Sequence, residues 1–116
     1  MSCMELDDQA VLNVIEPMMD DVMSGVLNRD YAHHSCHFSV DLKSSITADA
    51  FLAKCERWEA MWGRPGQREK VAIFRKEKSF TVLWHQLYDN TEDQILAATT
   101  VAVKGGRYFV DGFFLE

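Results

Sequence analysis

The first part of the chain carries apolar residues at helical spacing. Between positions 6 and 28, the apolar residues that recur on one face are Val11, Ile15, Met18, Val22 and Val26. Asp20 and Asp21 face away from them, so this stretch predicts an amphipathic helix with one stripe toward the core. Pro17 lies inside the stretch. We expect a kink or a restart there, because proline removes a backbone donor and clashes with the preceding turn.

A second helix is predicted to begin at Ala48, where Thr47 can cap it, and to end at Gly63, which is followed by Pro65. One face of this helix is apolar, and it is formed by Phe51, Cys55, Trp58 and Trp62. Cys55 is therefore expected to be a small buried hydrophobe and not a reactive thiol.

Beyond Gln67 the pattern changes to runs of β-branched and aromatic residues. It predicts four strands, at about 68–76, 79–88, 94–104 and 107–115. The connections are short, so the strands form an antiparallel meander that follows the helices. At 116 residues and 47% hydrophobic, the chain fits one domain, 1–116, with one core. The fold class is therefore α+β, with N-terminal helices packed on a four-stranded antiparallel sheet.

The last hairpin sets the register of its two strands. If Gly105 and Gly106 form a two-residue turn, Lys104 faces Arg107 and Thr100 faces Asp111. Asp111 is the only acidic residue in the predicted strands after position 80, which makes it a candidate catalytic carboxylate.

The middle hairpin is expected to place Trp84 opposite Ala98. His85 and Asp111 then lie on opposite faces and form no catalytic dyad, unless a one-residue bulge shifts the register. Both faces of the sheet are apolar in this register, and the helices can cover only one. We therefore expect a homodimer through the sheet.

The order of these features resembles the nuclear transport factor 2-like (cystatin-like, cone-shaped α+β) superfamily, as a small bacterial-type member. The stretches that carry the resemblance are "RDYAHHSCHFSVDLKSSITADAFLAKCERW", "VLWHQLYD" and "GGRYFVDGFFL", within residues 10 to 115. The resemblance implies a curved sheet wrapped around helices, a cavity at the wide end and frequent dimerisation. The superfamily includes isomerases, dehydratases and transport adaptors. No catalytic motif of theirs matches this chain position by position, so the resemblance assigns no catalytic residue.

The segment "HHSCHF", His33 to Phe38, holds three of the four histidines and one of the three cysteines. His33 and His37 share the spacing of zinc-binding helices, but the glutamate of HExxH is absent, and His34 and Cys36 would point elsewhere on a helix. A nucleophile and its base usually come from separate elements, which disfavours Cys36 as a nucleophile here. We expect a short solvated helical turn, no metal ligands and no cofactor.

Charge and targeting signals exclude several classes of protein. The net charge is −6, and the acidity lies mainly in residues 1–31. No dominant basic face appears, so we expect no nucleic-acid partner. Neither a secretory signal nor an apolar run of about 18 residues is present, which predicts a cytoplasmic protein without a membrane segment. The three cysteines have irregular spacing and are expected to be free thiols.

Three functions remain open from the sequence. The first is a non-catalytic dimeric module with an apolar cavity for a small hydrophobic ligand, and its candidate lining residues are Trp58, Trp62, Trp84 and Tyr88. The second is a small cofactor-free isomerase or lyase that uses a pocket carboxylate or histidine, with Asp111 and His85 as the candidates. The third is a protein-interaction adaptor.

Overall fold

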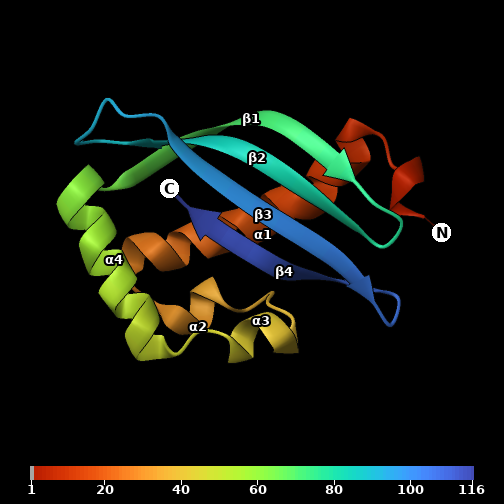
Figure 1. Ribbon diagram of the computed structural model, residues 1–116, viewed down its shortest axis with the longest axis horizontal. Coiled ribbons are helices and arrows are strands. Elements are labelled where there is room, and N and C mark those ends of the chain that lie inside the picture. The colour runs from red at the N-terminus through yellow and green to blue at the C-terminus, as the bar shows by residue number, and fades with distance from the viewer. Residues whose placement is uncertain (1) are drawn as a thin grey trace.

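The computed structural model describes residues 2–116 and confirms the α+β fold class. In chain order, its elements are η1 (Cys3–Glu5), α1 (Asp8–Asn28), α2 (Tyr31–His34), α3 (Val40–Ser44), α4 (Ala48–Trp62), β1 (Pro65–Arg75), β2 (Ser79–Tyr88), β3 (Ile95–Lys104) and β4 (Arg107–Leu115). The strands form one antiparallel sheet in the order β1-β2-β3-β4 (Figure 1). Within residues 2–116, no helix combines the length and the apolarity needed to cross a membrane.

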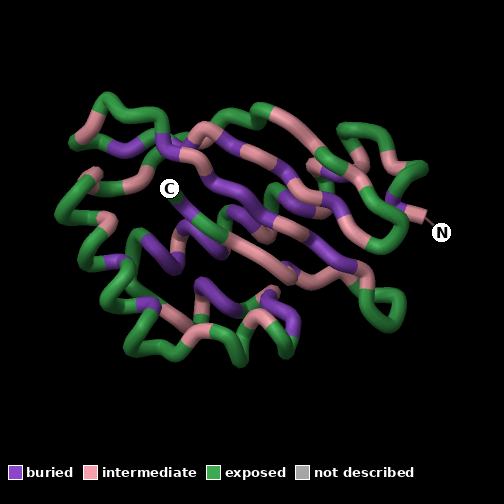
Figure 2. Tube along the Cα trace, viewed as in Figure 1, coloured by how far each residue is buried: buried purple, intermediate pink, exposed green. Residues whose placement is uncertain are grey.

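The helices gather on one side of the curved sheet. In Figure 1 the sheet lies in front of α1, while α2, α3 and α4 follow its lower and left edges. The core fills the space between α1 and the sheet, and its fully buried side chains include Val11, Ile15, Met19, Phe80, Val82 and Val101. Burial alternates along β2, as expected for a strand with one face on the core (Figure 2).

Helix α1 begins at a conventional cap and continues through Pro17. The Asp7 carboxylate accepts a hydrogen bond from the Ala10 amide at 2.8 Å. We expected either a kink or a restart at Pro17, and a restart does not occur, since the helix runs from residue 8 to residue 28. Ile15 and Met19, on either side of the proline, are both fully buried. Their burial against the sheet holds the helix together across the lost hydrogen bond.

The end of α1 folds the chain back onto itself. Arg29 adopts a left-handed conformation with φ of 52°, which ends the helix. Asp30 then caps α2, and its side chain accepts from the His33 amide at 3.1 Å. Gly25 faces the returning segment, and a Cβ atom there would overlap the backbone nitrogen and Cα of His34. The close approach of α2 to α1 therefore requires glycine at this position.

The middle register differs from our expectation by one residue. Trp84 pairs with Ala97 and not with Ala98. Cross-strand partners share a face, so the buried residues of β2 must lie beside those of β3. In the observed register Trp84 and Ala97 lie on the same face, and both are buried in the core.

The last hairpin contains a bulge that the sequence did not show us. Lys104 faces Arg107 as expected, but Thr100 faces Gly112 and not Asp111. The register shift lies between Thr100 and Val101, and it leaves Asp111 as the extra residue of β4. Beyond the bulge the alternation of β4 is reversed relative to an unbroken strand, so Leu115 is buried and Phe114 is exposed.

Substitution of Gly25 by alanine should destabilise the protein by at least about 2 kcal/mol. Glycine to alanine in an open helix normally stabilises by about 1 kcal/mol, so the sign itself is informative. Urea unfolding of Gly25→Ala and of Ser24→Ala, a control one position earlier in α1, measures the difference. A Gly25→Ala protein as stable as the control would contradict the close contact with His34.

Candidate functional site

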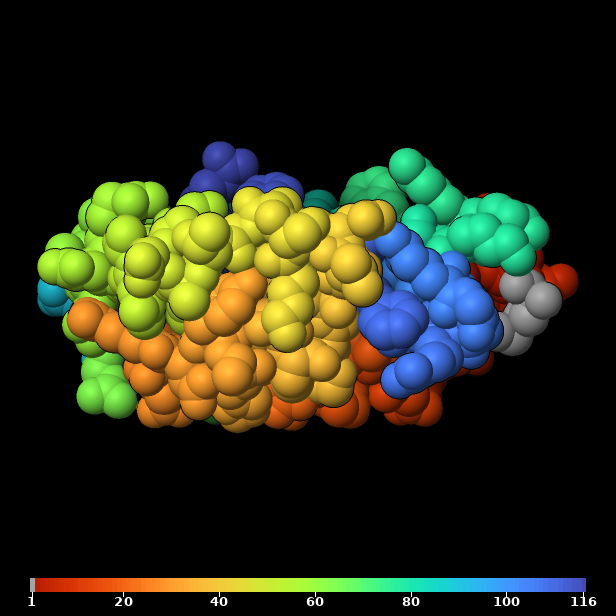
Figure 3. Space-filling view, turned by 90° about the horizontal axis from the view of Figure 1, so that it is seen from below, coloured from red at the N-terminus to blue at the C-terminus, as the bar shows by residue number. Residues whose placement is uncertain are grey.

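A cavity of about 290 Å³ lies between α2, α3, α4 and the end of β4. Its walls are mainly apolar, and they include Phe38, Leu42, Ile46, Phe51, Trp58 and Phe113. Seen from below, α2, α3 and α4 form the outer side of this region, with the β3–β4 hairpin next to α3 (Figure 3). The volume is at the lower end of the range for small-molecule sites.

His34 is one of the polar residues of the cavity lining, and it is only 3% exposed. Its ring stacks on Phe51, with the ring centroids 4.2 Å apart, and meets Phe38 and Phe113 edge-on. Burial lowers the pKa of His34 to about 4, against the opposing effect of a hydrogen bond to the Val22 carbonyl. The imidazole is therefore neutral at neutral pH.

The hydrogen bond of His34 fixes which ring nitrogen carries the proton. Nδ1 lies 2.9 Å from the carbonyl oxygen of Val22, which can only accept, so Nδ1 is the donor. The neutral ring then has a lone pair on Nε2. Within residues 2–116, no protein group forms a hydrogen bond with Nε2. The cavity lining thus includes one unused hydrogen-bond acceptor in an aromatic surround.

Of the four aromatic residues that we expected to line a ligand cavity, Trp58 lines this one. Trp62 and Tyr88 pack against each other instead, with ring centroids 5.2 Å apart. Trp84 lies on the core side of β2, beneath the Arg68 guanidinium at 5.1 Å. Burial raises the pKa of the Tyr88 hydroxyl. The structure therefore does not bring the four side chains into one lining.

The two candidate catalytic residues lie outside the lining of this cavity, each with its own partner. The Ser39 hydroxyl donates to Asp111 at 2.6 Å, and the Lys104 ammonium lies 3.0 Å from the same carboxylate. These two groups, Ser39 first, lower the pKa of Asp111. Nδ1 of His85 lies 4.0 Å from a Glu69 carboxylate oxygen. No hydrogen bond joins His85 to Asp111.

The residue that the sequence analysis missed is His34. We expected a solvated turn, and this was wrong for His34, which is buried. Phe38, the last residue of the same segment, is also buried: it is 8% exposed and forms a β-bridge to Val110 of β4. Gly25 was the signal in the sequence that could have indicated the burial of His34, since a glycine inside an apolar helix often marks the close approach of another backbone segment.

No protein-family model matches the chain, and no curated protein matches its sequence. Among solved structures, an NTF2-like protein of unknown function from Pseudomonas putida KT2440 aligns with 94% of this chain and 87% of its own length, at a TM-score of 0.50 and 16% identity. The chain has the nuclear transport factor 2-like fold. The chain also aligns with the structure of Bd1075 from Bdellovibrio bacteriovorus, at a TM-score of 0.53 and 9% identity, over 89% of the length of this chain. The chain spans 39% of the length of that Bdellovibrio structure.

The buried neutral His34 should make stability depend on pH. Its pKa is about 4 when folded and about 6.5 in the ordinary state, so between these values the unfolded chain binds more protons. The stabilising contribution of the neutral His34 to the free energy of unfolding is fully present above about pH 6.5. It is lost as the pH falls toward 4, and the total loss is up to about 3 kcal/mol. Asp21 and Asp111 have lowered pKa values, and their contributions are lost only at still lower pH.

Urea unfolding at about pH 7 and about pH 4.5 measures this dependence. His34→Gln keeps a polar side chain but cannot titrate, so its stability should change less between the two pH values. Equal pH dependence in the wild-type and variant proteins would show that His34 is not the group responsible.

Proposed function

We propose that this chain is a dimeric module that binds a small, largely apolar ligand carrying one hydrogen-bond donor. The observation that carries the proposal is the imidazole of His34, which lines an aromatic cavity and whose Nε2 has no hydrogen-bond partner among residues 2–116. Aromatic walls favour an apolar ligand, while the unpartnered Nε2 of His34 favours a hydroxyl or N–H group on it.

Binding explains this cavity better than proton transfer does. A general base works best with a pKa near the working pH, whereas burial lowers the pKa of His34 to about 4. The cavity lining within residues 2–116 contains no carboxylate. A cofactor-free isomerase or lyase would need such a base, so the ligand-binding function takes precedence over the catalytic alternative.

The ligand proposal is tested with a matched pair of probes, 2-naphthol and 2-methoxynaphthalene. The two have similar apolar bodies, but only the naphthol can donate a hydrogen bond to Nε2 of His34. Titration calorimetry should show binding of 2-naphthol and about 5- to 10-fold weaker binding of the ether, which corresponds to roughly one neutral hydrogen bond.

A variant that fills the cavity provides the structural control for these probes. Ala50 lines the cavity from α4, whereas Ala53 is exposed on the same helix and does not line it. Ala50→Trp should abolish binding of 2-naphthol, and Ala53→Trp should leave it unchanged. Equal binding of both probes, or binding that survives Ala50→Trp, would rule out this cavity as the site.

The sheet surface that faces away from the helices supports the dimer. It carries a largely apolar set of side chains, which includes Leu83, Leu87, Leu96, Ala98, Ala102 and Phe109. In Figure 1 this surface faces the viewer, and among residues 2–116 no helix covers it. A continuous apolar surface of this kind is typical of an interaction site. A second copy of the chain provides a surface of the same character.

Light scattering at micromolar concentration should give twice the mass of one chain. Leu83→Glu places a charge in the apolar sheet surface and should shift the protein toward monomer. Leu52→Glu introduces the same change at an exposed leucine of α4, 40% exposed and away from the sheet, and should remain dimeric. A monomeric wild-type protein would overturn the proposed assembly.

A further inference from the structure

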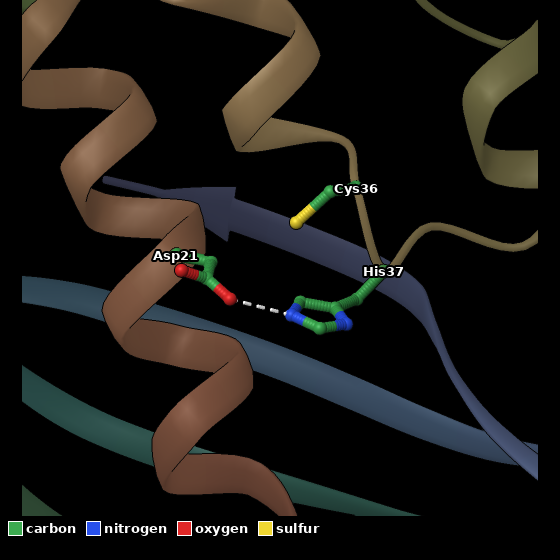
Figure 4. A group of neighbouring side chains, drawn as sticks. All are labelled: Asp21, Cys36 and His37. Carbon is green, nitrogen blue, oxygen red and sulfur yellow. Dashed lines mark hydrogen bonds and ion pairs between the residues drawn. The ribbon is translucent and has the colours of Figure 1, made fainter.

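The turn after α2 directs two metal-binding side chains toward α1. Helix α2 ends at His34, so Cys36 and His37 do not continue its helical pattern. The turn is fixed from behind by β4, since the Val110 amide donates to the His37 carbonyl at 2.7 Å and the Ser39 amide donates to the Val110 carbonyl at 2.8 Å. Figure 4 shows both side chains pointing from the turn toward Asp21 of α1.

The Asp21 carboxylate forms hydrogen bonds with two histidine side chains. Nε2 of His37 lies 2.6 Å from one carboxylate oxygen, and Nε2 of His33 lies 2.8 Å from the other. A carboxylate oxygen of Asp21, Sγ of Cys36 and a ring nitrogen of His37 all lie within 4.8 Å of one another. Cys36 is exposed and the other two are partly exposed, so an ion can reach all three.

We propose that Asp21, Cys36 and His37 bind a zinc ion, while His33 holds the second oxygen of the Asp21 carboxylate. One thiolate, one imidazole and one carboxylate form a donor set that suits Zn²⁺, whereas Mg²⁺ and Ca²⁺ prefer oxygen donors alone. Tetrahedral zinc separates its donor atoms by about 3.3 to 3.8 Å, so side-chain movements of roughly 1 Å suffice. Three protein ligands leave the fourth position to water.

Binding replaces groups that already interact in the metal-free protein. The ion takes the place of the proton on Nε2 of His37, and the neutral ring then carries its proton on Nδ1. The Cys36 thiol releases its proton to water and becomes a thiolate ligand. His33 keeps its hydrogen bond to Asp21 and orients the carboxylate, as partners of metal ligands commonly do. This site is independent of the ligand proposed for the His34 cavity.

Calorimetry of the full chain with Zn²⁺ alone, under a phosphine reductant, tests the proposal. We expect one ion per chain, and a loss of at least about 100-fold in affinity for each of Asp21→Asn, Cys36→Ser and His37→Ala. His33→Ala should cost about 10- to 100-fold, as expected for a residue that orients a ligand. Asp20→Asn removes the neighbouring carboxylate, which pairs with Arg68 at 2.8 Å, and should bind zinc normally.

Alkylation of the wild-type protein gives a second readout that needs no variant to fold. Cys36 is exposed, whereas Cys3 and Cys55 are buried and act as internal references. Zn²⁺ should protect Cys36 from iodoacetamide, and Co²⁺ in its place should give the near-ultraviolet charge-transfer absorption of a cobalt–thiolate bond. Unprotected Cys36 at saturating Zn²⁺, or equal zinc affinity in wild type and Asp21→Asn, would overturn the site.

Discussion

The close packing of α2 against α1 is the constraint on which the rest of the structure depends. Gly25 leaves room for the backbone of His34, and this approach lets the His34 ring reach the carbonyl of Val22 one turn earlier in α1. A single absent side chain thus determines the position of the connector between α1 and α3. From there, Phe38 continues onto the edge of β4, where it pairs with Val110.

A second local irregularity completes the cavity from the side of the sheet. The bulge at Asp111 reverses the alternation of β4 and turns Phe113 and Leu115 toward the helices, and both of them line the cavity together with Phe114. The Asp111 carboxylate accepts a hydrogen bond from the hydroxyl of Ser39, and the same hydroxyl caps α3. The same carboxylate therefore fixes the bulge to the helix that forms one wall. Gly25 of α1 and the bulge at Asp111 of β4 act together. Gly25 allows the backbone of His34 to approach α1, and the bulge turns the ring of Phe113 toward the ring of His34.

Regular periodicity made most of the fold predictable. The stripe of α1, the cap at Thr47 and the turn at Gly105 and Gly106 are local signals, and the elements they predict form in the structure. The order of these elements, together with stretches such as "GGRYFVDGFFL", carried the resemblance to the NTF2-like superfamily. Register was harder to predict, since the polar loop between β2 and β3 leaves two pairings one residue apart that bury similar side chains.

The His34 cavity and the cluster of Asp21, Cys36 and His37 were less predictable, because both depend on departures from regular structure. Treating residues 33–37 as one helix separates Cys36 from His37, whereas the actual turn directs both toward Asp21 of a different helix. The bulge beside Thr100 has no signal in a pattern of alternating residues. Burial of His34 arises from contacts with Phe51 and Phe113, both distant in sequence, and helical spacing carries no information about such contacts.

The central claim is that His34 is a neutral imidazole with its proton on Nδ1 and a free lone pair on Nε2. Nitrogen NMR of the labelled imidazole rings, followed from about pH 7 to about pH 5, measures the protonation state and the tautomer together. The account predicts that His34 stays neutral and in the Nδ1–H form throughout this range. Titration of His34 near the ordinary pKa of 6.5, or an Nε2–H tautomer, would contradict it.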